Sequence, residues 1–284
     1  MRLRTLPVSV AGVIMAMGLG VMDGNFSPVP ALLCLVFAVL AQIASNFANE
    51  YYDFRAGFDR KGREGPRRGV TEGDITPGAM KRATYFTLLL ACVVGCSLIW
   101  YGGWWLVAVG AFIALGVLAY SAGPYPLSRH ALGEVAVIFF FGIIPVNFTY
   151  YLQALDWNPH VLLASLSAGL MGANVLIVNN YRDCDDDRAV GKVTLAVKFG
   201  RGTVSRLYLV NGYAAVMLMI PVWMQLSTWA SLVPVVYLYL HSALWWKIVS
   251  RRGAALNPML GMTSLVMLFY CLSFAITAFF LTFA

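Results

Sequence analysis

The sequence predicts an all-helical protein that crosses a lipid bilayer many times, and three observations support this. Of its 284 residues, 60% are hydrophobic and only 12% are charged, whereas soluble domains are nearer half apolar and a quarter charged. The stretches 83–128, 135–155, 207–246 and 253–284 contain no Asp, Glu, Lys or Arg. A helix needs about 20 apolar residues to cross a bilayer, so each stretch has room for one or two spans.

Turn signals between and within these stretches divide the chain into nine predicted spans. Backbone polar groups inside lipid must be satisfied within their own segment, so we expect helices. The runs are too long for barrel strands and lack the alternation that such strands show. We treat residues 1–284 as a single transmembrane domain. The predicted spans are 6–22, 30–48, 83–101, 104–122, 135–152, 161–178, 208–225, 229–246 and 259–283.

The basic residues predict the orientation of these spans. With a cytoplasmic N-terminus, all 20 Lys and Arg fall in the N-terminal segment or in the connections after spans two, four, six and eight. The outward connections carry only two charges, Asp23 and Asp156. This is the distribution expected from the positive-inside rule. The net charge of +7 therefore belongs to one face of the membrane, and we expect no nucleic-acid partner.

Most of the acidic residues gather in two short segments, 46–59 and 179–188, which we call the first and second acidic phrases. Their acidic residues lie just past the expected cytoplasmic end of an even-numbered span. In the first phrase Asn49 is followed four residues later by Asp53, and in the second Asn179 is followed by Asp183. A spacing of four places two side chains on one helical face. The phrases lie four spans apart, which predicts two similar four-helix halves around one central cavity, with a ninth helix added.

The next carboxylate differs between the two phrases. Asp187 follows Asp183 by four residues and continues the same helical face, whereas Asp59 follows Asp53 by six residues, across Gly57. Glycine readily adopts the backbone conformations that tight turns require. We therefore expect the chain to turn at Gly57 and bring Asp59 back beside Asp53.

Carboxylates clustered at a membrane edge repel one another unless cations join them. Oxygen ligands without nearby His or Cys favour a hard ion, and too few ligands for a closed cage favour Mg²⁺, which keeps water and binds substrate phosphate. Arg63, Arg67, Arg68 and Lys192 follow the phrases and are suited to diphosphate oxygens that the metal does not hold. The alternative is two ordinary solvated loops with carboxylates paired to nearby arginines, but the repetition on one membrane face favours a ligand site.

Further phrases carry a family resemblance over most of the chain. They are Arg4-Thr-Leu-Pro7, Asn49-Glu-Tyr-Tyr-Asp53, Gly57-Phe-Asp59, Gly65-Pro66-Arg-Arg68-Gly69, Tyr120-Ser-Ala-Gly-Pro124, Leu132-Gly-Glu134, Asn179-Asn-Tyr-Arg-Asp183 and Gly191-Lys192-Val-Thr194. In these phrases the chain resembles the UbiA-type intramembrane prenyltransferases. The family commonly has Asp after the first Asn, where this chain has Glu50.

The resemblance implies a Mg²⁺-dependent enzyme of the bacterial inner membrane that transfers a polyprenyl group from polyprenyl diphosphate to an aromatic acceptor. The six-residue spacing from Asp53 to Asp59 is similar to that of the branch acting on 1,4-dihydroxy-2-naphthoate in menaquinone biosynthesis. The hydroxybenzoate branch usually has its second Asp where this chain has Gly57. The reaction of the naphthoate branch also releases carbon dioxide and gives demethylmenaquinol and diphosphate.

The resemblance also implies roles for individual residues. Asp53, Asp59, Asp183 and Asp187 would be catalytic and, with Asn49 and Asn179, would hold the metal. Loops at about 49–82 and 179–206 would cap the active site. Tyr120 and Tyr181 would be neighbours of the allylic cation or the ring, or else interfacial aromatics. The implied substrate-binding residues are Asn49, Arg63, Arg68, Tyr120, Asn179, Tyr181, Arg182 and Lys192.

The sequence leaves two alternative functions open. The first is a cation transporter or channel, because intramembrane acidic residues often mark ion paths. It fits poorly, because the carboxylates cluster at one face and the span centres hold almost no ionisable groups, His241 being the nearest. The other is a prenyltransferase acting on 4-hydroxybenzoate, homogentisate or a similar phenol.

Overall fold

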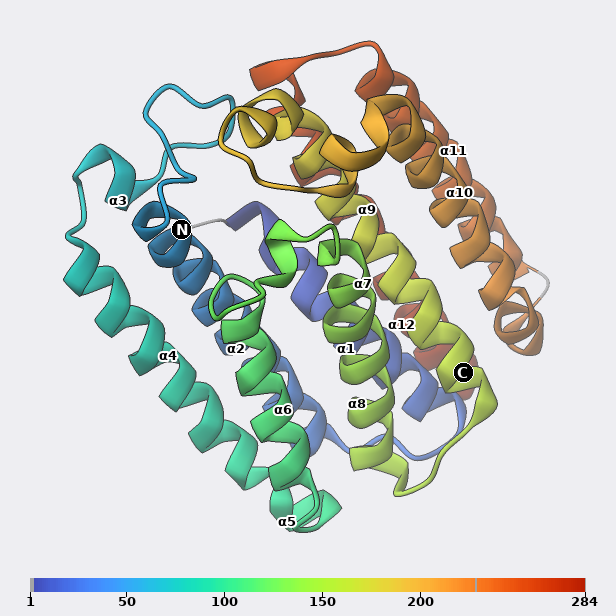
Figure 1. Ribbon diagram of the computed structural model, residues 1–284. Coiled ribbons are helices and arrows are strands. Elements are labelled where there is room, and N and C mark those ends of the chain that lie inside the picture. Colours follow the sequence, from blue (N-terminus) through green and yellow to red (C-terminus); the bar gives the residue numbers. More distant parts are fainter. Residues whose placement is uncertain (1–2, 228, 284) are drawn as a thin grey trace.

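The computed structural model describes residues 3–227 and 229–283, and within them the chain forms one helical bundle (Figure 1). The all-helical prediction is confirmed for these residues. In chain order the elements are η1 Leu3–Thr5, α1 Leu6–Met22, α2 Pro28–Arg55, α3 Gly69–Glu72, α4 Pro77–Ser97, α5 Ile99–Gly102, α6 Leu106–Ala119, η2 Leu127–Arg129, α7 Gly133–Val137, η3 Ile138–Ile143, α8 Ile144–Ala154, α9 Pro159–Ala189, α10 Leu195–Leu226, η4 Trp229–Ser231, α11 Leu232–Val249, η5 Gly253–Leu256 and α12 Asn257–Phe283.

Every predicted span coincides with a helical segment. Seven segments among the described residues are long and apolar enough to cross a membrane, and the apolar helices α1 and α6 occupy the two remaining predicted spans. These two helices are shorter, so the count of nine crossings stays a prediction. The chain is a multi-pass membrane protein. Large apolar side chains on the outer face of α4, such as Phe86, Leu89 and Val93, are more than half exposed and suit contact with lipid.

The ends of the long helices follow local sequence signals. The helices α4 and α9 begin at Pro77 and Pro159, where the missing proline N–H costs no helical hydrogen bond. The residue before each proline is a side-chain cap: Thr76 accepts from a backbone N–H of the first turn of α4, and Asn158 does the same for α9.

The predicted loops at 49–82 and 179–206 contain long helical parts: half of the first segment and most of the second are helical, which corrects the description of both as loops. The helix α2 continues to Arg55 and α9 to Ala189, so Asn49 and Asp53 of the first acidic phrase, and the whole second phrase, lie on the last turns of long helices, whereas Asp59 follows α2. Next, α10 begins at Leu195, with a break at Gly200, where φ is 80°. The apolar run in the sequence ends before the helix does, because the backbone hydrogen bonds of each helix continue into the polar residues that follow.

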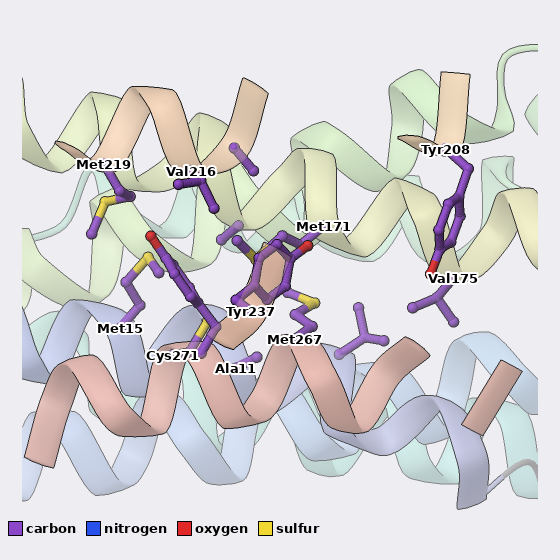
Figure 2. Packing of buried hydrophobic residues seen from close by; sticks show 14 of the residues in the cluster. Ala11, Met15, Met171, Val175, Tyr208, Val216, Met219, Tyr237, Met267 and Cys271 are labelled. Atoms are coloured by element: carbon purple, nitrogen blue, oxygen red, sulfur yellow. The ribbon is translucent and has the colours of Figure 1, made fainter. Parts of the chain in front are cut away.

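The main core lies among α1, α9, α10, α11 and α12. Figure 2 shows Met15 of α1, Met171 of α9, Met219 of α10, Tyr237 of α11 and Cys271 of α12 packed against one another. All five are almost fully buried. Since α1 and α12 come from opposite ends of the chain, this core joins the first and last helices to the helix that carries the second acidic phrase.

The connections are sorted between the two ends of the bundle. At the end where the N-terminus is labelled in Figure 1 lie η1 and the connections after α2, α6, α9 and α11. The connections after α1, α4, α8 and α10 lie at the other end. Both acidic phrases and the basic segments therefore share one end, as the charge pattern predicts.

Candidate active site

The first acidic phrase ends α2 and turns back on itself. Asp53 is 1% exposed and lies on the same face as Asn49. Gly57 has a φ of 77°, and the Phe58 N–H donates to the Asp53 carbonyl oxygen at 2.9 Å. The Asp59 N–H lies 3.4 Å from the same oxygen. The turn predicted at Gly57 is confirmed, and it returns Asp59 to the end of the helix.

The second acidic phrase occupies the last turns of α9. Asn179, Asp183 and Asp187 follow one helical face, and the Asn179 amide donates to Asp183 Oδ2 at 3.4 Å. Asp183 is 1% exposed. Because Asp53 and Asp59 of the first phrase and Asp183 and Asp187 of the second are buried, their negative charges require cationic partners within the protein or its ligands.

Two basic side chains join the phrases directly. Arg63 contacts Asp59 at 2.7 Å with one guanidinium nitrogen and Asp183 at 2.6 Å with the other. The Lys192 ammonium lies 3.9 Å from Asp53 and 3.5 Å from Asp187. Each cation therefore links a carboxylate of the first phrase to one of the second, and the two phrases form a single site.

The carboxylates strengthen the positive charge of both bridging side chains. Burial alone would lower the pKa of Lys192, but the neighbouring Asp53, Asp187 and Asp183 outweigh burial and raise the pKa above its ordinary value. Burial is likewise outweighed at Arg63, where Asp183 and Asp59 raise the pKa of the guanidinium. Both groups stay protonated at neutral pH and are suited to binding an anion.

Arg68 and Asn49 form a second layer of contacts. Both terminal nitrogens of Arg68 donate to Asn49 Oδ1 at 3.4 Å, and Arg68 Nε lies 3.5 Å from Asp59. The Asn49 amide donates to the Ser121 hydroxyl at 3.0 Å. Asn49 is thus held in place from both sides.

Arg129 joins the site, although the sequence did not single it out. One guanidinium nitrogen donates to Asp53 at 3.1 Å, to the Tyr52 carbonyl oxygen at 3.2 Å and to the Ser121 carbonyl oxygen at 3.0 Å. Its guanidinium also lies over the Phe58 ring. The available signal was that Arg129 is the one basic residue in its connection, between two long neutral stretches.

Glu50, the departure from the family phrase, has a structural contact. Its carboxylate accepts a hydrogen bond from the Val70 N–H at 3.1 Å and so holds the start of α3 against α2. Glu50 is 6% exposed.

Arg182 supports the second phrase from within the helix. Its guanidinium donates to both oxygens of Asp183, at 2.7 and 2.8 Å, and also to Asn179 Oδ1 and Asn257 Oδ1 at 2.9 Å. The last contact ties α9 to the start of α12. Arg182 therefore orients Asp183 and Asn179.

The two predicted aromatic residues have different positions. Tyr120 lies on the wall of two adjoining cavities, one polar and one apolar. Tyr181 is 3% exposed and lines neither, because its ring lies under the guanidinium groups of Arg201 and Arg252, which also contacts its hydroxyl. The structure does not bring Tyr181 to the substrate space that the sequence analysis expected for it.

A polar cavity opens beside the bridged phrases and contains about 970 Å³ of unfilled space. Its wall includes Asn49, Arg63, Arg68, Asn179 and Lys192. With Tyr120, six of the predicted substrate-binding residues are thus collected around one space, and cations dominate this part of its wall. Such a wall is suited to an anionic ligand.

An apolar cavity of about 1070 Å³ continues from the polar one into the bundle. Side chains such as Phe37, Ile113, Phe140, Phe148 and Leu152 line it. The two cavities share five wall residues, which are Gln42, Ser45, Tyr120, Val137 and Phe141. A ligand with a charged head and a long apolar tail would fit both.

The donor set suits a metal that keeps part of its coordination for other ligands. Among the described residues, no three His, Cys, Asp or Glu side chains converge closely enough to hold an ion by themselves. The Asp187 Oδ2 atom is nevertheless buried without a hydrogen-bond partner. The site offers small groups of carboxylate and amide oxygens, and one of these buried oxygens has no hydrogen-bond partner. Such a donor set fits Mg²⁺ that is bound jointly by protein, water and phosphate.

Comparisons with known proteins agree with this architecture. The model of the UbiA prenyltransferase family matches residues 7–265. The chain is 38% identical over 214 residues to the 1,4-dihydroxy-2-naphthoate octaprenyltransferase of Escherichia coli (strain K12), covering 73% of this chain and 70% of the relative. To the protein of the same name from Mycobacterium tuberculosis (strain ATCC 25618 / H37Rv) it is 35% identical over 277 residues, covering 96% and 93%.

Solved structures share the fold at low sequence identity. The apo structure of a UbiA homolog from Aeropyrum pernix K1 has a TM-score of 0.70 at 14% identity, covering 94% of both chains. A UbiA homolog from Archaeoglobus fulgidus bound to GPP and Mg²⁺ has a TM-score of 0.64 at 16% identity, covering 96% of this chain and 98% of the other.

Proposed function

Because the chain belongs to the UbiA prenyltransferase family, we propose that it transfers a polyprenyl group from polyprenyl diphosphate to 1,4-dihydroxy-2-naphthoate. The reaction releases diphosphate and carbon dioxide and gives demethylmenaquinol, a step of menaquinone biosynthesis. The acceptor is supported by the names of relatives that match most of this chain. The family assignment sets aside the cation-transporter alternative.

One observation carries the proposal: a cation-bridged pair of acidic helix ends borders a polar cavity that continues into an apolar one. This order matches a prenyl diphosphate, whose charged head and hydrocarbon tail need adjacent surroundings of opposite polarity. The diphosphate would lie against Arg63, Arg68 and Lys192. The prenyl chain would follow the apolar cavity.

Magnesium is the proposed cofactor, supported by the oxygen donors of the two phrases and by the Mg²⁺ named with a structural relative. Asn49, Asp53 and Asp59 on one side and Asn179, Asp183 and Asp187 on the other would hold it. When bound, Mg²⁺ would neutralise charge on the departing diphosphate.

The chain's own residues would favour bond cleavage by stabilising the leaving group. Arg63, Arg68 and Lys192 are fixed by carboxylate and amide contacts before substrate arrives, so little reorganisation is needed as negative charge develops. Arg182 and Arg129 keep Asp183 and Asp53 oriented. Tyr120, at the junction of the cavities, would place its ring near the allylic cation. The apolar wall excludes water that would otherwise capture that cation.

The proposed location is the inner membrane of a bacterium, with the N-terminus and the active-site end facing the cytoplasm. The segments at 49–82 and 179–206 would cap the site there. The concentration of Lys and Arg at that end supports this orientation.

A direct assay tests the proposal. Purified protein is incubated with a polyprenyl diphosphate and, separately, with 1,4-dihydroxy-2-naphthoate, 4-hydroxybenzoate and homogentisate, and products are identified by mass spectrometry. We expect prenylated, decarboxylated product from the naphthoate alone, loss of activity with EDTA and recovery with Mg²⁺. Preferred use of another acceptor would contradict the proposed substrate, and full activity without divalent metal would contradict the cofactor.

A matched pair of variants tests the assigned site within the same assay. Asp183→Asn should lower kcat/KM by roughly 10²–10³-fold, because the buried carboxylate acts where charge develops. Asp185→Asn is the control on the same helix, since Asp185 is exposed and paired with Arg188 and Arg201. Similar activities of the two variants would refute the assignment.

A further inference from the structure

Glu134 is a buried carboxyl group that the proposed chemistry leaves unused. It lies in α7, is 4% exposed and forms part of the wall of the polar cavity. Its Oε1 atom accepts a hydrogen bond from the Asn180 amide at 2.8 Å. Its Oε2 atom is buried without a hydrogen-bond partner. A buried, unsatisfied carboxyl oxygen is costly, so a ligand that satisfies it gains affinity there.

The charge of its surroundings distinguishes Glu134 from the two acidic phrases. Asp53, Asp59, Asp183 and Asp187 each contact at least one Arg or Lys, whereas no ion pair of the described residues includes Glu134. It is also the one carboxyl group among the described residues that line the polar cavity. The cavity therefore presents a hydrogen-bond acceptor at Glu134 and cations elsewhere on its wall.

Glu134 also lies close to the junction of the two cavities. Val137 and Phe141 follow it by three and seven residues, and both line the polar and the apolar cavity. The ligand group that meets Glu134 would therefore sit near the point where head and tail of a prenyl diphosphate join. A ligand hydroxyl group can donate to the free oxygen there.

We propose that Glu134, oriented by Asn180, forms the binding subsite for a ring hydroxyl of the aromatic acceptor. This inference rests on the proposed function. The acceptor carries hydroxyl groups that donate hydrogen bonds and a carboxylate that does not. The carboxylate turns toward Arg63, Arg68 or Lys192, and one hydroxyl turns toward Glu134. The subsite thus fixes which edge of the ring faces the prenyl carbon.

The isosteric variant Glu134→Gln tests the subsite. Asn180 donates to one oxygen of the side chain, so Gln would keep its carbonyl oxygen there and direct its NH₂ group, a donor, toward the ligand hydroxyl. We expect KM for the acceptor to rise roughly ten- to a hundredfold, the range for a buried hydroxyl group that loses its hydrogen-bond acceptor. We expect KM for the prenyl diphosphate to change by less than about threefold, because the cations proposed to bind the diphosphate are unchanged.

Inhibition by two substrate analogues distinguishes a direct contact between Glu134 and the acceptor from an indirect effect of the substitution on the structure. The compounds 1-hydroxy-2-naphthoate and 4-hydroxy-2-naphthoate each lack one ring hydroxyl, and their Ki values are measured in competition with the acceptor. The wild type should bind the analogue without the Glu134-bound hydroxyl roughly ten- to a hundredfold more weakly than the other. Glu134→Gln should bind the two within about threefold, because the Gln NH₂ group offers no acceptor for the hydroxyl hydrogen.

Controls keep the test decisive. Glu72→Gln makes the same chemical change at the end of α3, in a residue that lines neither cavity, and should leave both KM values unchanged. If Glu134→Gln does not fold, Asn180→Ala, which retains the carboxylate but removes its orienting bond, is measured in the same way. Wild-type acceptor KM and wild-type discrimination in the variant would overturn the inference while leaving the proposed function intact. Failure of the wild type to prenylate any acceptor would overturn both.

Discussion

Two cations unite parts of the site that are far apart in sequence. Arg63 is 120 residues from Asp183 along the chain, yet their side chains lie 2.6 Å apart. Lys192 makes the complementary link between Asp53 and Asp187. Removing one partner of a buried ion pair leaves the other charge uncompensated, typically at a cost of about 3–5 kcal/mol. The bridges therefore serve assembly of the site as well as ligand binding.

Arg63→Gln should reduce kcat/KM for the prenyl diphosphate by roughly 10²–10³-fold, because it removes a preorganised positive charge at the leaving group. The matched control is Arg67→Gln. Arg67 lies in the same loop and pairs with Asp74, but both members of this pair are more than half exposed. Exposed pairs contribute about 0–1 kcal/mol. Steady-state kinetics at varied prenyl diphosphate would contradict the role of Arg63 if the two variants behaved alike.

Among the elements, the loop after α2 is held to the rest of the active-site end by Glu64. Its carboxylate accepts from the Ala254 N–H at 2.7 Å, its carbonyl oxygen accepts from the Asn257 amide at 3.2 Å, and its own N–H donates to Asp186 at 3.0 Å. Three elements, α9, η5 and α12, thus fix one loop. This anchoring explains how Arg63, one residue earlier, reaches the second acidic phrase.

The helices that line the cavities also approach closely enough to require glycine. A Cβ atom at Gly142, in the wide π turn of η3, would lie 2.4 Å from the Gly169 Cα and from the Ser165 carbonyl oxygen of α9. Since the obstructing atoms are backbone, the two helices would have to separate. The π turn occurs beside the cavities, where such turns are often found.

Gly142→Ala should therefore destabilise the protein by about 1–3 kcal/mol, the usual cost of overpacking. Thermal unfolding in detergent measures this as a lower Tm. Gly202→Ala in α10 is the control, because a Cβ atom there meets nothing within 4 Å and alanine favours helix. Equal Tm values for the two variants would argue against close packing of η3 on α9.

For the whole molecule, the bundle separates a polar, charged end from an apolar interior. The apolar cavity extends from the polar one between helices of the N-terminal part of the chain, while the main core packs α1 against the C-terminal helices. A substrate can therefore keep its head among buried charges and its tail inside the protein. The same arrangement requires a fixed orientation, because all charged substrate groups must enter at one face.

Cysteine labelling tests this orientation in intact cells. Lys61→Cys lies in the exposed loop after α2, and Asp156→Cys lies in the exposed connection between α8 and α9. A membrane-impermeant maleimide should label position 156 in intact cells and position 61 only after the membrane is opened. The unmodified protein, whose five cysteines lie buried or on α4, gives the background. The reverse labelling pattern would contradict a cytoplasmic active site.

The sequence by itself determined the helical membrane fold, the location of charges at one end, and the two Asn-x-x-x-Asp faces with the turn at Gly57. These features depend on local periodicity, chain length and backbone preference, which a sequence states directly. The two acidic phrases lie together, as expected for one shared pocket. The contacts of Arg63 and Lys192 that join the phrases did not follow from the spacing of residues in the sequence.

Only the tertiary structure decided which side chains meet. It placed Arg129 on Asp53, turned Tyr181 away from the cavities, and set Glu134 in a wall among cations supplied by other elements. Each outcome depends on how helices that are distant in sequence pack, and on which face each helix turns toward its neighbours. A helix that is apolar on all sides can pack in several rotations about its own axis. The physical reason is that long-range contacts are fixed by the packing of the whole bundle, which no short stretch of sequence encodes.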